Sequence, residues 1–322
     1  MEKVYEGNGE DLIELFQSVT PELEVDIQKW RWKYLENPLK ENLILVYEDR
    51  KKIVGEEAIV PFKAYFKGEI LKIGHSVDSM VLNEYRGKGI FKKLALKSLK
   101  EGKEMGYSYF YGFPNKNSLP IYTKKLNWMS FGYIRRWIFP LNLNILSLKF
   151  KIDFSILSPL FKIGKNLLKR DYGFERVYNF NGVDVYLENL KKHYDIFLLR
   201  DEDFLKWRYL DHPYYKYDIF KDDKNIFVLR IKDVDIKRGT IEEFIYSDYL
   251  SFSKILSFSI KYFIENNVDL IDIWVRKGDP LEKILFYKGF IPYQKRLIII
   301  YPFENINFSK KYFFNFSDLD VI

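Results

Sequence analysis

The sequence predicts an α/β protein of two similar lobes, because one motif occurs twice and similar elements follow each copy. The first copy reads Trp-Lys-Tyr-Leu-Glu-Asn-Pro at residues 32–38, and the second reads Trp-Arg-Tyr-Leu-Asp-His-Pro at residues 207–213. Each copy ends a helix-like segment at a proline, which cannot continue a helix. A strand-like run follows each copy, at residues 42–48 and 225–231. Because internal repeats indicate repeated structural units, we expect a tandem duplication.

The first lobe shows a regular order of strands and helices. Residues 52–66 and 70–82 read as long neighbouring strands joined by a Lys-Gly-Glu turn. In residues 88–105, apolar side chains recur on one face and lysines occupy the other, which predicts an amphipathic helix packed against a sheet. A strand at residues 107–113 and a further helical segment at residues 118–128 follow. This order predicts a sheet that is at least partly parallel.

The second lobe repeats this order. Residues 250–265 parallel the amphipathic helix, residues 270–275 the strand after it, and residues 280–290 the segment after that strand. We therefore predict an α/β (α+β) fold of two tandem lobes, residues 1–140 and 175–322, each with a mixed central sheet flanked by helices.

Residues 141–174 separate the two predicted lobes. They contain few acidic residues and many lysines, and their apolar residues recur at helical spacing. We expect a helical linker that packs across both lobes. The alternative is an amphipathic helix lying on an anionic membrane surface.

Composition excludes several classes of site. The 322 residues provide room for two hydrophobic cores, and the absence of cysteine excludes disulfides, thiolate metal sites and a cysteine nucleophile. The three histidines are scattered without metal-ligand spacing, so we expect no metal. The lysines behind the net charge of +7 are spread along the chain, so we expect no nucleic-acid partner. The acidic N-terminus and the short apolar runs predict a soluble cytoplasmic protein without a transmembrane segment.

The most informative segment follows the strand at residues 70–82. It reads Tyr-Arg-Gly-Lys-Gly-Ile-Phe at residues 85–91 and leads into the amphipathic helix. Such a turn presents backbone N–H groups and the positive end of a helix dipole to a phosphate-bearing ligand. It matches neither the P-loop nor the dinucleotide-binding pattern. Beyond the next strand stand Gly-Phe-Pro-Asn at residues 112–115 and then Tyr122. We therefore expect a diphosphate-containing cofactor with chemistry beside it.

These two segments resemble the acyl-CoA-binding region of the GNAT superfamily of N-acyltransferases. Its turn has the pattern [QR]-x-x-G-x-[GA] after a strand ending in V-x-P-E-Y, which Arg86, Gly89 and the preceding Val-Leu-Asn-Glu-Tyr match. Phe91 stands where small residues are usual, but the form RGxGIF occurs in a subgroup whose second motif is GFPNxxSxPxY. Residues 112–122 match that second motif, and the likeness covers residues 78–128.

The resemblance implies two tandem GNAT-like lobes, of which the first binds acyl-CoA and catalyses the reaction. The implied reaction is transfer of an acetyl group from acetyl-CoA to a small primary amine, such as an amino sugar, by direct attack on the thioester. Asp78 would accept the amine proton or anchor the amine, and Tyr122 would protonate the leaving thiolate. The implied cofactor-binding residues, with backbone amides near the first two as oxyanion donors, are Met80, Val81, Arg86, Gly87, Lys88, Gly89, Ile90, Phe91, Asn115 and Ser118.

The second lobe lacks the glycine turn, because residues 248–252 read Asp-Tyr-Leu-Ser-Phe. We therefore expect only the first lobe to bind CoA and the second to form a wall of the acceptor pocket. Two alternatives remain. A Fem-like aminoacyl transferase also pairs two such lobes, although its tRNA-borne donor needs no pyrophosphate-binding turn. The other is a non-catalytic binding protein associated with a membrane surface through the linker.

Overall fold

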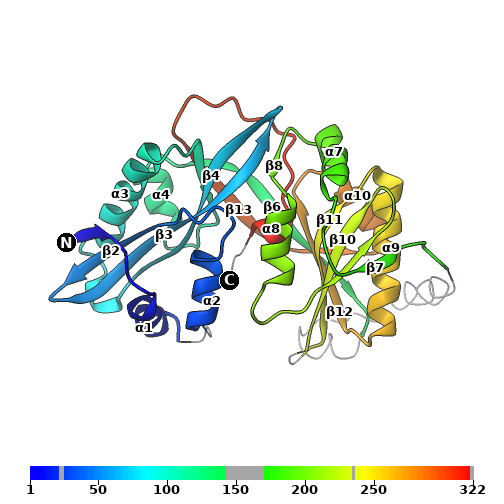
Figure 1. Ribbon diagram of the computed structural model, residues 1–322, viewed down its shortest axis with the longest axis horizontal. Helices are drawn as coiled ribbons and strands as arrows, with labels where there is room; N and C mark the ends of the chain where they lie inside the picture. Colours follow the sequence, from blue (N-terminus) through cyan, green and yellow to red (C-terminus); the bar gives the residue numbers. More distant parts are fainter. Residues whose placement is uncertain (22–24, 143–169, 234–235, 320–322) are drawn as a thin grey trace.

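The structure is a computed structural model that describes residues 1–21, 25–142, 170–233 and 236–319. In this part of the chain thirteen strands form one continuous mixed sheet, with helices on both of its faces (Figure 1). The predicted fold class is confirmed. Of the predicted linker at 141–174, residues 143–169 lie outside the described residues, so the linker and its membrane alternative stay predictions. No helix in the described ranges is long and apolar enough to cross a membrane.

The first half of the chain follows the predicted order closely. Its elements are β1 (Glu2–Val4), α1 (Glu10–Val19), α2 (Ile27–Tyr34), β2 (Leu43–Asp49), β3 (Lys52–Phe66), β4 (Glu69–Val81), η1 (Asn83–Tyr85), α3 (Ile90–Glu104), β5 (Tyr109–Gly112), α4 (Leu119–Lys125) and β6 (Met129–Pro140). Helices α3 and α4 lie on one face of the sheet and α2 on the other (Figure 1). The aromatic side chains of α2 belong to a different core cluster from the apolar side chains of α3 and α4.

The second half repeats the plan and also contains strands that the sequence pattern did not indicate. Its elements are β7 (Glu175–Val177), α7 (Asp184–His193), β8 (Ile196–Leu198), α8 (Glu202–Leu205), η3 (Lys206–Leu210), β9 (Asp218–Lys221), β10 (Ile226–Lys232), β11 (Arg238–Ile245), α9 (Tyr249–Glu265), β12 (Leu270–Arg276), α10 (Leu281–Tyr287), β13 (Ile291–Pro302) and η4 (Phe316–Asp318). Strand β9 directly follows the second motif, so the predicted run at residues 225–231 is the next strand, β10. Four residues with charged ends are too short to show an alternating pattern.

The two halves exchange their last strands. The strand order is β1-β2-β3-β4-β5-β13-β6-β12-β11-β10-β9-β7, with β8 attached to β3. Strand β13 pairs antiparallel with β5 of the first half, and β6 pairs antiparallel with β12 of the second half. The two exchanged strands also pair with each other in the middle of the molecule (Figure 1). The division predicted at residues 140 and 175 therefore runs through a continuous sheet.

The repeated motif lies where the two halves meet. The indole rings of Trp32 and Trp207 stack with centroids 4.7 Å apart and planes inclined by 13°. Each indole Nε1 donates a hydrogen bond of 2.9 Å to the backbone carbonyl oxygen of the other tryptophan. Both side chains are buried. This reciprocal pair is the contact expected of an internal two-fold relation between repeats.

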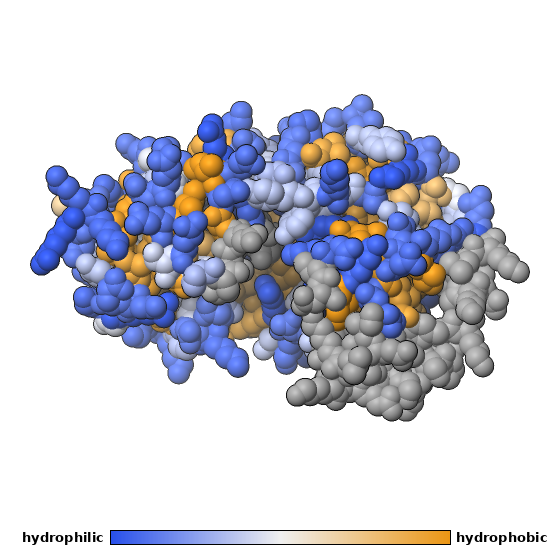
Figure 2. Space-filling model, turned by 90° about the horizontal axis from the view of Figure 1, so that it is seen from below, coloured by the Kyte–Doolittle hydropathy of each residue, from blue (hydrophilic) through white to orange (hydrophobic). Residues whose placement is uncertain are grey.

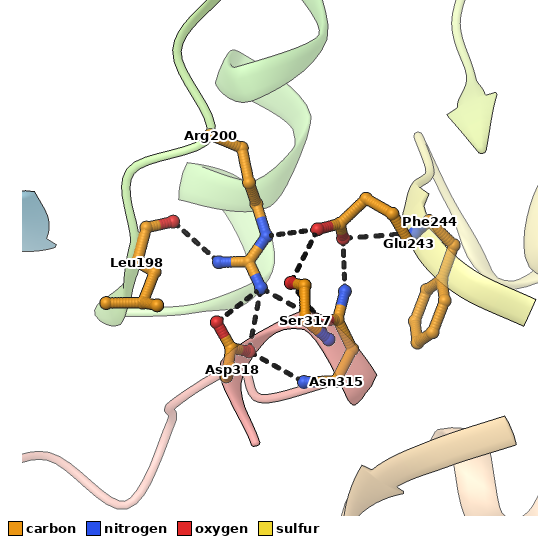
Figure 3. A network of polar contacts seen from close by, with 7 residues as sticks. All are labelled: Leu198, Arg200, Glu243, Phe244, Asn315, Ser317 and Asp318. Carbon is orange, nitrogen blue, oxygen red and sulfur yellow. Dashed lines mark hydrogen bonds and ion pairs between the residues drawn. The ribbon is translucent and has the colours of Figure 1, made fainter. Parts of the chain in front are cut away.

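The surface is mainly hydrophilic, and the view from below shows a hollow between the two halves in which hydrophobic residues are visible (Figure 2). A segment near the C-terminus is held against the rest of the second half by buried polar contacts (Figure 3). The Arg200 guanidinium donates to Glu243 on β11 at 3.1 Å and to Asp318 on η4 at 2.7 Å. Burial raises the pKa of Asp318 to about 6 although Arg200 opposes the shift. Phe314, just before η4, packs edge-on against Tyr111 of β5.

The tryptophan pair is expected to be a major contribution to stability. Trp32→Ala should lower the free energy of unfolding by about 3–5 kcal/mol, because it removes a large buried ring and leaves a cavity. Trp32→Phe keeps an aromatic ring but removes one hydrogen bond, so its loss should be smaller, about 1–3 kcal/mol. Urea denaturation followed by circular dichroism measures both. Equal losses for the two variants would contradict a role for stacking.

Candidate active site

The glycine turn connects β4 to α3 as the sequence predicts. Gly87 and Gly89 have φ angles of +79° and +78°, a conformation that favours glycine. Gly89 is the N-cap residue of α3, and no side chain caps the helix among the described residues. A Cβ atom at either glycine would meet nothing within 4 Å. The turn therefore leaves open space beside uncapped amide groups, which suits an anionic group such as a pyrophosphate.

A cleft of about 560 Å³ lies beside this turn, a volume typical of small-molecule sites. It opens where β4 and β5 separate, since the parallel pairing ends at Ser76 and Gly112 while β4 continues to Val81. The predicted site residues that line it are Asp78, Met80, Val81, Arg86, Phe91, Asn115, Ser118 and Tyr122. The predicted residues that do not line it are Gly87, Lys88, Gly89 and Ile90. Ile90 is buried in the core beneath α3, so only its backbone could reach a ligand.

Tyr122 lies in the cleft with its hydroxyl at a polar cluster. The hydroxyl is 3.0 Å from Ser76 Oγ and 3.1 Å from Ser79 Oγ. The ring packs edge-on against Phe91 and Trp128, at centroid distances of 5.4 and 4.9 Å. Burial raises the pKa of Tyr122, so the phenol stays protonated at neutral pH and can donate a proton or a hydrogen bond. The Phe91 contact explains a bulky residue where the related motif has small ones.

Asn115 and Ser118 shape the loop before α4. Asn115 Oδ1 accepts hydrogen bonds of 2.9 Å from the backbone N–H groups of Asn117 and Ser118. Ser118 Oγ accepts one of 3.1 Å from the Asn115 N–H. Both side chains thus stabilise the turn that starts the helix. Their predicted contact with the cofactor stays a prediction.

Asp78 sits at a β-bulge. In the β3–β4 pairing, Met80 is opposite Glu56 and Val77 is opposite Ala58, so Asp78 and Ser79 share one partner, Glu57. The bulge gives Asp78 a φ of +48°, an unusual value for a residue other than glycine. Bulges are frequent near active sites because they re-aim side chains. Here the Asp78 side chain turns toward α2, while Ser79 faces Tyr122.

The carboxylate of Asp78 is held by two residues of the first repeated motif. Lys33 Nζ lies 2.7 Å from Asp78 Oδ2, and the Tyr34 hydroxyl donates to the same oxygen at 2.5 Å. The side chains of Lys33 and Asp78 are only 5% and 9% exposed. The neighbouring carboxyl group of Glu56 has a pKa well above its usual value, because of burial first and of Asp78 second. Asp78 thus anchors α2 to the bulge as well as lining the cleft.

Glu57 is a site residue that the sequence reasoning missed. It is buried on the Tyr122 side of the sheet, where its Oε1 accepts a 3.0 Å hydrogen bond from Ser76 and a longer one of 3.5 Å from Tyr122. Burial raises the pKa of Glu57 to about 7, against the opposing effect of its hydrogen bonds. The available signal was the pair Glu56 and Glu57 in an otherwise apolar strand.

The corresponding turn of the second half is built differently. Asp248 is the N-cap residue of α9, and its carboxylate accepts a 2.8 Å hydrogen bond from the Ser251 N–H. This bond and further hydrogen bonds from the side chains of Ser251 and Ser247 lower the pKa of Asp248. A carboxylate therefore occupies the helix N-terminus, where it would repel a phosphate group.

Comparisons with known proteins agree with this geometry. Residues 4–129 match the acetyltransferase (GNAT) domain family. A GCN5-related N-acetyltransferase from Anabaena variabilis is similar in structure, with a TM-score of 0.66 and 15% identity over 93% of this chain and 72% of that one. A conserved protein of unknown function from Enterococcus faecalis, a probable N-acyltransferase, gives 0.67 and 16% over 94% and 73%. No curated protein matches the sequence.

The two-lobed arrangement also has a counterpart among solved structures. N-myristoyltransferase of Saccharomyces cerevisiae has a TM-score of 0.63 at 10% identity, over 93% of this chain and 82% of that one. Identities this low show the fold alone. The domain match assigns residues 4–129 to the GNAT acetyltransferase family, and the whole chain has a tandem fold like that of N-myristoyltransferase.

The ion pair under α2 is expected to matter for folding. Lys33→Met should lower the free energy of unfolding by about 3–5 kcal/mol, because it leaves the Asp78 carboxylate buried without its cation. The double variant Lys33→Met, Asp78→Asn should recover most of this loss, since neither charge remains and asparagine tolerates the left-handed backbone. Urea denaturation of the single and double variants gives the coupling energy. Additive losses would show that the pair is not coupled.

Proposed function

We propose that this protein is an acetyl-CoA-dependent N-acetyltransferase that acts on a small primary amine, with amino sugars as one class to test. The observation that carries the proposal is the uncapped, glycine-lined N-terminus of α3 beside a cleft that holds a protonated tyrosine. The open space at Gly87 and Gly89 fits the pyrophosphate of CoA. When bound, acetyl-CoA supplies the activated thioester.

The chain's own residues supply binding and proton positions. Amide groups of residues 86–90 would bind the pyrophosphate, with Arg86 at the start of the turn. The unpaired edge of β4 near Met80 and Val81 could donate a backbone N–H toward the thioester oxygen. Tyr122 holds a proton inside the cleft for the departing sulfur. Asp78, with one carboxylate oxygen held by Lys33, fits an amine-orienting role at least as well as that of a general base.

The carboxylate at the start of α9 supports a division of labour between the halves. With Asp248 at the position that corresponds to Gly89, we propose that the second half binds no CoA. Ile299 of the exchanged strand β13 nevertheless lines the cleft. The second half would therefore form part of the wall of the first half's site, including the wall of the pocket for the acceptor amine.

Acetyl-CoA is expected to raise the melting temperature of the protein, since a ligand that binds only the folded state stabilises it. Gly89→Glu should abolish the shift, because it places a carboxylate at the helix N-terminus that would receive the pyrophosphate. Gly68→Glu is a matched control, since Gly68 also has a positive φ and open space at Cβ but lies in the β3–β4 turn. Its shift should persist. Calorimetry should count one CoA per chain; two would contradict the division of labour.

The role of Tyr122 can be tested by thiol release from acetyl-CoA with a panel of amines and amino sugars. Tyr122→Phe should lower kcat by about a hundredfold, within the usual range for a lost general acid, with little change in the KM for acetyl-CoA. The ring contacts with Phe91 and Trp128 remain in this variant, so the fold is preserved. An unchanged kcat would remove Tyr122 from the acid role.

A further inference from the structure

We propose that Glu57 stores the proton that Tyr122 delivers into the cleft, and that it passes this proton to Tyr122 through Ser76. This inference rests on the proposed function. It assigns a part to a buried carboxyl group that is too far back to touch a substrate, since Glu57 does not line the cleft while Ser76 and Tyr122 do. Glu57 is thus a positioning and proton-supplying residue behind the tyrosine.

The geometry provides a continuous path of hydroxyl groups. Ser76 Oγ lies 3.0 Å from Glu57 Oε1 and 3.0 Å from the Tyr122 hydroxyl. With Glu57 protonated, its O–H can donate to Ser76 Oγ, and the Ser76 O–H can donate to the tyrosine oxygen. The oxygens of Ser76 and Tyr122 then each give up one proton and receive another, while Glu57 gives up one and becomes a carboxylate. The direct Glu57–Tyr122 contact of 3.5 Å is longer, so Ser76 offers the better route.

Tyr122 alone would be a poor source of a net proton. Loss of its proton would leave a phenolate buried in an apolar core between Phe91 and Trp128 and close to Glu57. Burial raises the pKa of the phenol for this reason. If the O–H bond of Glu57 breaks as the O–H bond of Tyr122 re-forms, the tyrosine stays neutral. The charge that remains is a Glu57 carboxylate, and a proton from solvent later restores the acid.

The surroundings of Glu57 favour a group that titrates near neutral pH. Its Oε2 atom has no hydrogen-bond partner among the described residues, which penalises the charged form. Hydrogen bonds from Ser79, Ser76 and Tyr122 favour that form, and Asp78 on β4 opposes it. Glu56 is the other acidic group beside it on β3 but faces α2. Helix α3 contributes apolar side chains such as Leu94 to the core on this face of the sheet. The balance is a pKa of about 7.

This pKa sets the sign of the pH dependence. Glu57 must be protonated to supply the proton, so kcat should be high below pH 7 and fall as the pH rises through about 7. Glu57→Gln can still hydrogen-bond to Ser76 but cannot release a proton. Its kcat should be lower than wild type by about tenfold to a hundredfold below pH 7. The decline above pH 7 should vanish, and the KM for acetyl-CoA should change little.

Infrared spectroscopy tests the proton store without any turnover. The difference between the spectra of wild type and Glu57→Gln should contain a protonated-carboxyl band that disappears with a midpoint near pH 7, because the subtraction removes the bands of other buried carboxyl groups such as Glu56 and Asp318. Glu56→Gln is the matched control: it removes the adjacent buried carboxyl on the other face of the sheet and should keep both this band and the decline in kcat. Glu57→Asp should recover part of the pH dependence.

The outcomes separate this inference from the proposed function. A wild-type protein that turns over acetyl-CoA while Glu57→Gln keeps the same decline above pH 7 would overturn the proton store and leave the acetyltransferase intact. Absence of a band with a midpoint near pH 7 from the difference spectrum of wild type and Glu57→Gln would also overturn it. A protein that shows the band but never binds acetyl-CoA would overturn the proposed function instead. Circular dichroism should show that each variant folds.

Discussion

The candidate site depends on the exchange of β6 and β13 between the two halves. Because β13 takes the place beside β5, the first-half sheet is complete only with residues from the end of the chain. The cleft opens on the β4 side of β5, where β4 continues beyond its pairing with β5. Ile299 of β13 forms part of the cleft wall. A chain cut after residue 140 would lose this strand, and its own β6 would have no β12 to pair with. The duplicated fold therefore works as one unit.

The repeated motif links this frame to the chemistry. Trp32 and Trp207 form the reciprocal contact at the centre, and the next two residues of the first copy, Lys33 and Tyr34, hold Asp78 at the bulge of β4. The second half keeps a similar bulge in β11, where the extra residue Glu242 is buried next to Arg230 at 2.6 Å. Both halves thus have a bulge with a buried ion pair, although the cation comes from the repeated motif in the first half and from β10 in the second. What differs is the helix N-terminus that follows, with glycine in one half and aspartate in the other.

Sequence patterns predicted local features better than long-range ones. The glycine turn, the amphipathic helix α3 and the strands β3 and β4 could be predicted because periodicity and turn residues act over a few positions. Strand exchange could not, since an edge formed by residues 109–112 gives no local sign that residues 299–302 will pair with it. Glu57 was missed for a related reason. Its neighbours on β4 depend on the bulge there, which turns Asp78 toward Lys33 and Ser79 toward Tyr122, and the conformation of Asp78 that creates this bulge has no distinct sequence pattern.

Strand alternation explains why two consecutive acids of β3 have different surroundings. Neighbouring residues of a strand point to opposite faces of a sheet. Glu56 therefore joins Lys33 and Asp78 under α2, while Glu57 joins Ser76 and Tyr122 on the side of α4. Acyl transfer to an amine needs one proton removed from the amine and one supplied to the leaving sulfur. If these two protons move on opposite faces, the sheet separates the carboxyl group of Glu57 from that of Asp78. Burial raises the pKa of the Glu57 carboxyl on the cofactor side to about 7, while Asp78 forms an ion pair with Lys33 on the other face.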